Sequence, residues 1–173
     1  MKKNKKYELT NECDGINTRY RIRALRDFSD VKTGDLGGFI EYEDNLSHKG
    51  NCWVYYGARV MDNARVYDNA KICGGAMIFN NARIYGNAYV CDFVWIFNDA
   101  RVYDNAKIIG NARISGDANI CGNAYILLDL DDSVIKGNIK INYGIWNNMI
   151  VVDQQKFLIS TTLEKLPMGK LNG

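Results

Sequence analysis

Two series of side chains recur at equal intervals along the chain and could bind anions. The first series is Arg65, Arg83 and Arg101, and the second is Tyr67, Tyr85 and Tyr103. A guanidinium binds phosphate and carboxylate groups through paired hydrogen bonds, and Arg and Tyr are enriched where proteins hold their partners. These series predict a binding surface for an anionic small ligand or a protein partner. The alternative interpretation is structural, with cation–π contacts between guanidiniums and phenol rings.

A single histidine, His48, is the other candidate for chemistry. One histidine excludes a three-histidine metal centre within one chain, and we predict neither a metal site nor a cofactor. As a general base, His48 could take a proton from a hydroxyl or an amine. The repeat described below places it at an inward-facing position, where a partly buried structural role is the simpler interpretation.

The cysteines predict no metal site. Cys73 and Cys91 are separated by the same interval as the arginines, yet no third or fourth ligand accompanies them, so we interpret them as small apolar fillers. Five cysteines is an odd number, and no apolar stretch follows the basic start of the chain, so we expect reduced thiols and a cytoplasmic location. No apolar run is long enough for a membrane span. The net charge of +2 is too small to predict a nucleic-acid binder by charge alone.

The common interval of these series is three times a period of six. From residue 58 to 129, twelve hexads follow without insertion, with Ala first in eleven and Val or Ile third in all twelve. The same frame extends back to Ile40, which gives fifteen hexads over 40–129. Asn, Asp and Gly occupy the last two positions of most hexads, where they tolerate a left-handed backbone. The pattern predicts short strands joined by polar corners, which bury their apolar faces only by coiling and stacking.

Hexads such as ARVYDN and ARIYGN resemble those of the hexapeptide-repeat, left-handed parallel β-helix proteins. The resemblance implies an all-β, left-handed parallel β-helix with three hexads per coil, and hence about five coils over 40–129. The best-known activity of that family is acyl transfer, with a catalytic histidine often carried on a loop between hexads. Because no such loop interrupts the hexads here, we predict a protein that is not an enzyme. An acyltransferase-like enzyme with a site between subunits is the first alternative, and a structural assembly protein is the second.

The two ends lie outside the repeat. Residues 1–39 predict an N-terminal β-hairpin cap, and 130–173 a strand-rich C-terminal cap or oligomerisation tail, all within one domain. The segment RIRALRDFSDVKTGDLGGFIE, followed by EDNLS, resembles a phage and prophage group of hexapeptide proteins. The resemblance implies a phage or prophage product in a bacterial host. Our leading hypothesis is therefore an anti-defence factor that sequesters a nucleotide-type ligand or blocks a host defence protein or nucleic-acid surface.

One outward face of the predicted coils is apolar at its centre. Its side chains are Met77, Phe79, Trp95 and Phe97. A patch of this kind marks an interaction surface in a soluble protein. We therefore expect a homo-oligomer, either a trimer or a dimer, assembled through this face.

Overall fold

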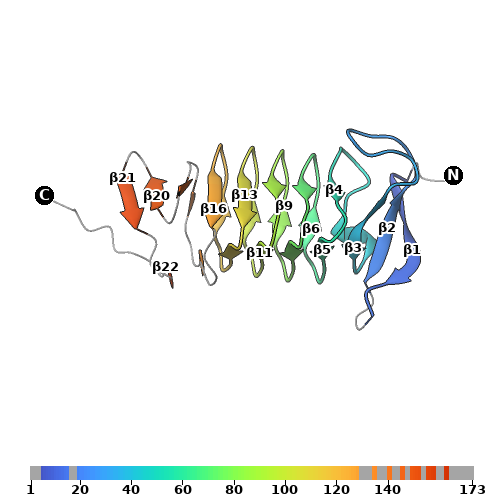
Figure 1. The fold of residues 1–173 in the computed structure, drawn as a ribbon, viewed down its shortest axis with the longest axis horizontal. Helices are drawn as coiled ribbons and strands as arrows, with labels where there is room; N and C mark the ends of the chain where they lie inside the picture. The colour runs from blue at the N-terminus through green and yellow to red at the C-terminus, as the bar shows by residue number, and fades with distance from the viewer. Residues whose placement is uncertain are drawn as a thin grey trace, which may run out of the picture.

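The computed structural model shows an all-β solenoid of about five stacked coils, each of about 18 residues (Figure 1). The structure describes residues 5–15 and 19–128, together with the backbone of six short strands further along the chain. This confirms the predicted fold class and the predicted coil length. No helix among these described residues is long and apolar enough to cross a membrane.

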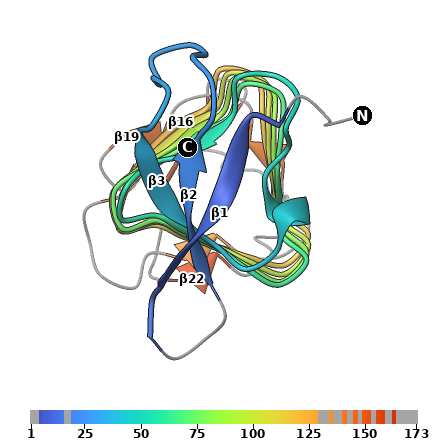
Figure 2. The same ribbon diagram turned by 90° about the vertical axis from the view of Figure 1, so that its right-hand side faces the viewer.

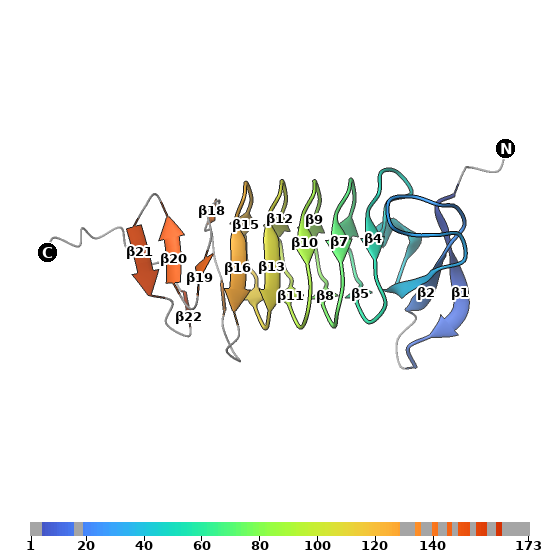
Figure 3. The ribbon, with the colours of Figure 1, turned by 45° about the horizontal axis from the view of Figure 1, so that its top comes forward.

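Three sheets form the three sides of the solenoid, and each coil contributes one strand to each sheet. The first sheet contains β5 (Arg59–Val60), β8 (Met77–Ile78), β11 (Trp95–Ile96) and β14 (Arg113–Ile114). The second contains β4 (Trp53–Val54), β7 (Lys71–Ile72), β10 (Tyr89–Val90), β13 (Lys107–Gly110) and β16 (Tyr125–Leu128), seen side by side in Figure 3. The third contains β6 (Arg65–Val66), β9 (Arg83–Ile84), β12 (Arg101–Val102) and β15 (Asn119–Ile120). Neighbouring strands are parallel, and each residue pairs with the equivalent residue of the next coil, as Val66 does with Ile84.

The core consists of ladders of identical positions stacked from coil to coil. The alanines at the first position of the hexads and the Val or Ile side chains at the third are buried throughout the repeat. Alanine at one position and a branched side chain at the other pack together in the narrow interior of the coils. The alternation of inward and outward residues in the sequence was therefore sufficient to predict the core.

The corners adopt the left-handed backbone that their composition predicted. Every fifth position of the hexads from Asp62 to Gly122 has a positive φ, whether the residue is Asp, Asn or Gly. Asp68 illustrates the non-glycine corners, with a φ of 57° and a carboxylate that accepts a hydrogen bond from the Gly86 N–H one coil later. Asn and Asp tolerate this region better than other side chains do, which explains their abundance here.

An antiparallel arrangement covers the first coil. The strands β1 (Tyr7–Cys13), β2 (Tyr20–Ala24) and β3 (Leu36–Ile40) pair in order, and β3 then pairs in parallel with β5. Figure 2 shows these strands crossing the end of the solenoid. Tyr7, Ile22 and Trp53 are buried beneath them. The expected N-terminal hairpin is thus present and shields the apolar end of the stack.

The repeat has one extended corner that the sequence frame did not predict. Leu46 pairs with Val66, and Val54 pairs with Ile72. The second members of these pairs are six residues apart (72 − 66), whereas the first members are eight apart (54 − 46). Two extra residues are therefore accommodated between Leu46 and Val54, and His48 lies among them. The prediction of an inward-facing His48 on uninterrupted hexads is wrong, because Leu46 takes the inward position instead.

Beyond residue 128 the described strands continue the three sheets. The strands β17 (Val134–Ile135), β18 (Lys140–Ile141) and β19 (Ile145–Trp146) extend them, and β22 (Thr162–Leu163) pairs with β17. The strands β20 (Met149–Val152) and β21 (Gln155–Leu158) form an antiparallel pair that follows β19. The expected role of this tail in capping or oligomerisation depends on residues that lie outside the described part of the chain.

Candidate anion-binding cleft

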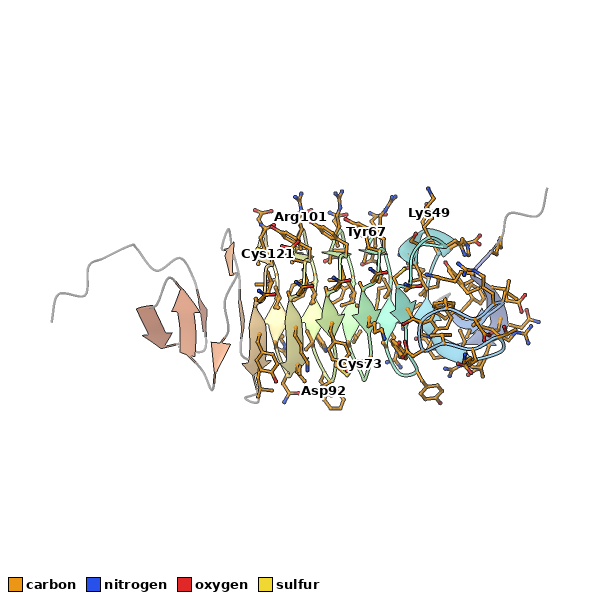
Figure 4. All side chains as sticks on the ribbon, turned by 90° about the horizontal axis from the view of Figure 1, so that it is seen from above. Lys49, Tyr67, Cys73, Asp92, Arg101 and Cys121 are labelled. Atoms are coloured by element: carbon orange, nitrogen blue, oxygen red, sulfur yellow. A yellow bond between two sulfur atoms is a disulfide. The ribbon has the colours of Figure 1, made fainter. Side chains whose placement is uncertain are left out.

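Arg65, Arg83 and Arg101 lie side by side on the third sheet. Arg65 is paired opposite Arg83, and Arg83 opposite Arg101, and all three are exposed. Figure 4 shows Arg101 on the same edge of the solenoid as Lys49 and Tyr67, with Cys73 and Asp92 away from that edge. Within the described residues, none of the three arginines makes an ion pair or a side-chain hydrogen bond. Their guanidiniums are therefore available to an anion.

The tyrosines of the second series stack on one another rather than on the arginines. The ring centroids of Tyr67 and Tyr85 are 4.8 Å apart, and those of Tyr85 and Tyr103 are 4.9 Å apart, with nearly parallel planes. Burial raises the pKa of Tyr67 and of Tyr85. A hydrogen bond with Cys121 raises the pKa of Tyr103 to about 12. All three phenols therefore stay protonated at neutral pH, and the expected cation–π contacts give way to ring stacking.

An open cleft of about 1040 Å³ lies where this ladder meets the first coil. Its lining residues are Lys5, Glu43, Asp44, Leu46, Ser47, His48, Lys49, Arg65, Val66, Tyr67 and Arg83. The cleft therefore contains part of each predicted series, together with the single histidine. Arg101, Tyr85 and Tyr103 lie further along the same sheet and are not among its lining residues. The sequence predicted that the Arg and Tyr series share one face, and in the structure one end of that face lines a cleft.

His48 lies on the extended corner, with its ring held on three sides. Its Nε2 is 2.7 Å from Glu43 Oε1, and its Nδ1 accepts a hydrogen bond of 3.2 Å from the Lys6 N–H. Its ring stacks on that of Tyr7 at a centroid distance of 4.3 Å. Since Nδ1 accepts, the neutral ring donates from Nε2 to Glu43. The carboxylate thereby orients the imidazole, as in other acid–base pairs.

Glu43 connects this pair to a second cation. Its carboxylate accepts a hydrogen bond of 2.6 Å from Lys5 Nζ as well as the bond from His48. The bond from Lys5, and then that from His48, lowers the pKa of Glu43. The carboxylate is therefore ionised at neutral pH. Glu43 belongs to the one 3₁₀ turn of the described chain, η1 (Glu43–Asn45).

A buried lysine, Lys6, lies next to His48 and is hydrogen-bonded to Cys52. The Nζ atom of Lys6 donates to the Cys52 carbonyl at 2.8 Å and lies 3.2 Å from the Cys52 Sγ. Burial lowers the pKa of Lys6 and raises the pKa of Cys52. The side chain of Lys6 is therefore anchored to Cys52, and its backbone N–H donates to His48 Nδ1.

Seven of the lining residues were not predicted as site residues from the sequence: Lys5, Glu43, Asp44, Leu46, Ser47, Lys49 and Val66. Glu43, Ser47 and Lys49 sit within a hexad frame that the structure shifts by two residues. The signal that could have found this shift was Leu46, a large apolar side chain at the first position of its hexad, where eleven of the twelve hexads from residue 58 have alanine. Placing Leu46 inward pushes His48 and Lys49 out to the corner.

The side chains of the apolar face partly bury one another. Phe79 and Phe97 stack at 4.9 Å, and Phe79 meets Trp95 edge-on at 6.5 Å. Met77 pairs with Trp95 across β8 and β11, and Trp95 remains 37% exposed. The face therefore exists as a continuous patch on the first sheet, and its role as an oligomer interface stays a prediction.

The cysteines differ from their interpretation as separate fillers. Cys73 and Cys91, on adjacent coils of the second sheet, are joined as a disulfide, with their Cα atoms 4.5 Å apart. Stacked coils place equivalent positions within the separation that a disulfide spans. Cys13, Cys52 and Cys121 are free. The described residues contain no group of three or more potential metal ligands.

Comparison with known proteins gives one informative similarity. No family model matches the chain. The chain is 35% identical over 81 residues to a curated protein named "uncharacterized acetyltransferase YdcK" of Escherichia coli (strain K12). The match covers 40% of this chain and 25% of that protein, so the chain spans about a quarter of the length of the relative.

The prediction that the chain is not an enzyme is wrong on this finding. It depended on the absence of a loop between hexads, and the relative carries the name of an acetyltransferase. The premise of uninterrupted hexads also fails in the structure, because two extra residues lie in the corner that contains His48.

Proposed function

We propose that the chain is an acyltransferase that works at the cleft beside His48. The observation that supports this most strongly is the convergence of a histidine–glutamate pair with exposed arginines in one cleft of about 1040 Å³. The named activity of the curated relative supports the same class of reaction. The anionic donor would be an acyl thioester of coenzyme A, whose phosphates suit Arg65, Arg83 and Lys49.

The reaction requires one proton transfer and one exchange of bonds. The oxygen or nitrogen of the acceptor attacks the thioester carbonyl, its new bond to the acyl carbon forms, and the carbon–sulfur bond breaks. The proton of the acceptor passes to the Glu43–His48 pair and then to the departing thiolate. Because Nε2 carries the proton of the neutral ring, only Nδ1 can accept one, so the acceptor must take the place of the Lys6 N–H on binding. Such bonds commonly rearrange when the substrate binds.

The test measures release of free thiol from acetyl-coenzyme A with a panel of amine and hydroxyl acceptors. His48→Asn keeps an acceptor for the Lys6 N–H but removes the base, so turnover should fall by about a hundred-fold or more. Phe93→Ala, on the exposed corner between β10 and β11, is the control and should retain full turnover. Unchanged turnover in His48→Asn would remove His48 from the chemistry, and a wild type inactive with every acceptor would contradict the proposal.

A phage or prophage origin rests on the amino-terminal resemblance, and an anti-defence role rests on that resemblance together with the Arg and Tyr series. The similarity to the named acetyltransferase gives them no support. They stay predictions about the biological setting, and the acyl-transfer proposal does not depend on them.

A further inference from the structure

We infer that the cleft recognises a nucleotide, with its base stacked on Tyr67 as the next ring of the tyrosine ladder. The inference deepens the proposed function, because a nucleotide bound here would be the handle by which the acyl donor is held. It rests on three features of the described residues: an uncovered ring face, a missing ring one coil earlier, and unpaired cations beside the gap.

The first feature is the end of the stack. Tyr85 is covered on both faces, by Tyr67 on one side and Tyr103 on the other, at 4.8 and 4.9 Å. Tyr67 is covered on one face only, and its side chain lines the cleft. Within the described residues, no other aromatic ring or cation stacks on Tyr67. A flat ligand ring can therefore continue the stack at this end.

The second feature is that Ser47 takes the place of the next tyrosine. The Ser47 N–H donates to the Val66 carbonyl at 2.9 Å, just as the Tyr67 N–H donates to the Ile84 carbonyl at 3.1 Å. Ser47 is thus the equivalent of Tyr67 on the preceding coil, and its small side chain leaves the space of a ring unfilled. Ser47 and Tyr67 both line the cleft, so this space opens into it.

The two ends of the tyrosine ladder differ in whether the next equivalent position is open to solvent. At the far end the equivalent position is Cys121, which is 3% exposed and hydrogen-bonded to Tyr103. At the near end the equivalent position, Ser47, borders a cleft. The near end alone therefore combines a small side chain with access from solvent among the described residues.

The third feature is charge next to the gap. Arg65 and Arg83 are exposed on adjacent paired strands, and Lys49 is exposed on the extended corner, all three lining the cleft. Within the part of the chain that the structure describes, these three make no ion pair. Parallel strands lie about 4.8 Å apart, so two guanidiniums can hold neighbouring phosphates of one ligand. A base on Tyr67 with phosphates on these cations is a nucleotide.

The inference is tested by calorimetric titration with ADP, pyrophosphate and adenosine. We expect ADP to bind more tightly than either fragment. Tyr67→Leu should weaken ADP binding about ten-fold and leave pyrophosphate binding unchanged, because stacking contributes only to the base. Arg83→Gln should weaken ADP and pyrophosphate alike.

Tyr103→Leu is the matched control. It removes one stacking contact with Tyr85, as Tyr67→Leu does, but leaves the cleft face of Tyr67 intact. Equal effects of the two variants on ADP, or ADP binding no tighter than pyrophosphate, would overturn the inference. Acetyl transfer from S-acetylpantetheine, a donor without a nucleotide, separates the two proposals. If that transfer depends on His48 while ADP fails to bind, the nucleotide inference falls and the acyl-transfer proposal stands.

Discussion

At the scale of single residues, the arrangement of Arg65, Arg83 and Arg101 carries an electrostatic cost. Three cations at the spacing of adjacent strands repel one another, by about 1 kcal/mol per neighbouring pair in a fully solvated setting. None of the three guanidinium charges is neutralised by an ion pair among the described residues. An anion bound between Arg65 and Arg83 would relieve this repulsion, so the ladder is better suited to binding than to stability.

Asn69, Asn87 and Asn105 lie at equivalent corners of successive coils and form an asparagine ladder, the opposite case, in which stacked polar residues stabilise the coils. Asn87 donates to the Asn105 Oδ1 at 3.0 Å and accepts from the Asn69 Nδ2 at 3.1 Å. Asn87→Ala removes both hydrogen bonds and should lower the free energy of unfolding by about 1–2 kcal/mol. Urea unfolding followed by circular dichroism measures this loss. Asn51→Ala, at an exposed position outside these hydrogen bonds, is the control, and an equal loss there would show that the ladder contributes nothing.

At the scale of elements, the segment between β2 and β3 is attached to the second sheet through one carboxylate. Asp30 accepts hydrogen bonds from the Lys71 Nζ at 2.7 Å and from the Tyr55 hydroxyl at 2.8 and 2.9 Å. The bond from Lys71 is the main cause that holds the pKa of Asp30 well below its usual range. This attachment fixes the cap against the coil that it covers.

The attachment should depend on pH. Because the folded-state pKa of Asp30 is lowered, its contribution to stability is present above the unfolded carboxyl pKa of about 4 and is lost as the pH falls through the folded value. The wild type should therefore be more stable than Asp30→Asn at pH 7, and this advantage should shrink at pH 3. Unfolding free energies at the two pH values provide the measurement. Lys71→Met should reduce the same pH dependence, and a difference between wild type and Asp30→Asn that does not vary with pH would contradict the assignment.

At the scale of the whole molecule, the apolar patch on the first sheet predicts self-association. Trp95 is 37% exposed beside the stacked rings of Phe79 and Phe97. We expect the wild type to be a trimer or dimer in native mass spectrometry, and Trp95→Glu to be a monomer, because a charge in an apolar interface is not solvated. Tyr56→Glu, at a side chain that is 70% exposed, should leave the assembly intact. A monomeric wild type, or an unchanged assembly in Trp95→Glu, would contradict the prediction.

The sequence by itself determined the coils, the core and the corners. A strict period of six, with Ala and a branched residue at alternate positions, permits only one set of side chains to face inward, as at Ala64 and Val66. It also determined the Arg and Tyr ladders, because equal spacing along the chain becomes adjacency when the coils are equal in length. These features are local or periodic, and they need no knowledge of distant contacts.

Only the tertiary structure decided where the ladder ends and what lies beside it. The sequence frame placed His48 at the position equivalent to Val66 one coil away, whereas the pairing in the folded protein selects Leu46. The hydrogen-bond donor to His48 Nδ1 is the N–H of Lys6, 42 residues earlier, in a segment outside the repeat. A cleft formed by an irregular corner and a distant segment has no period, so no repeat in the sequence could reveal it.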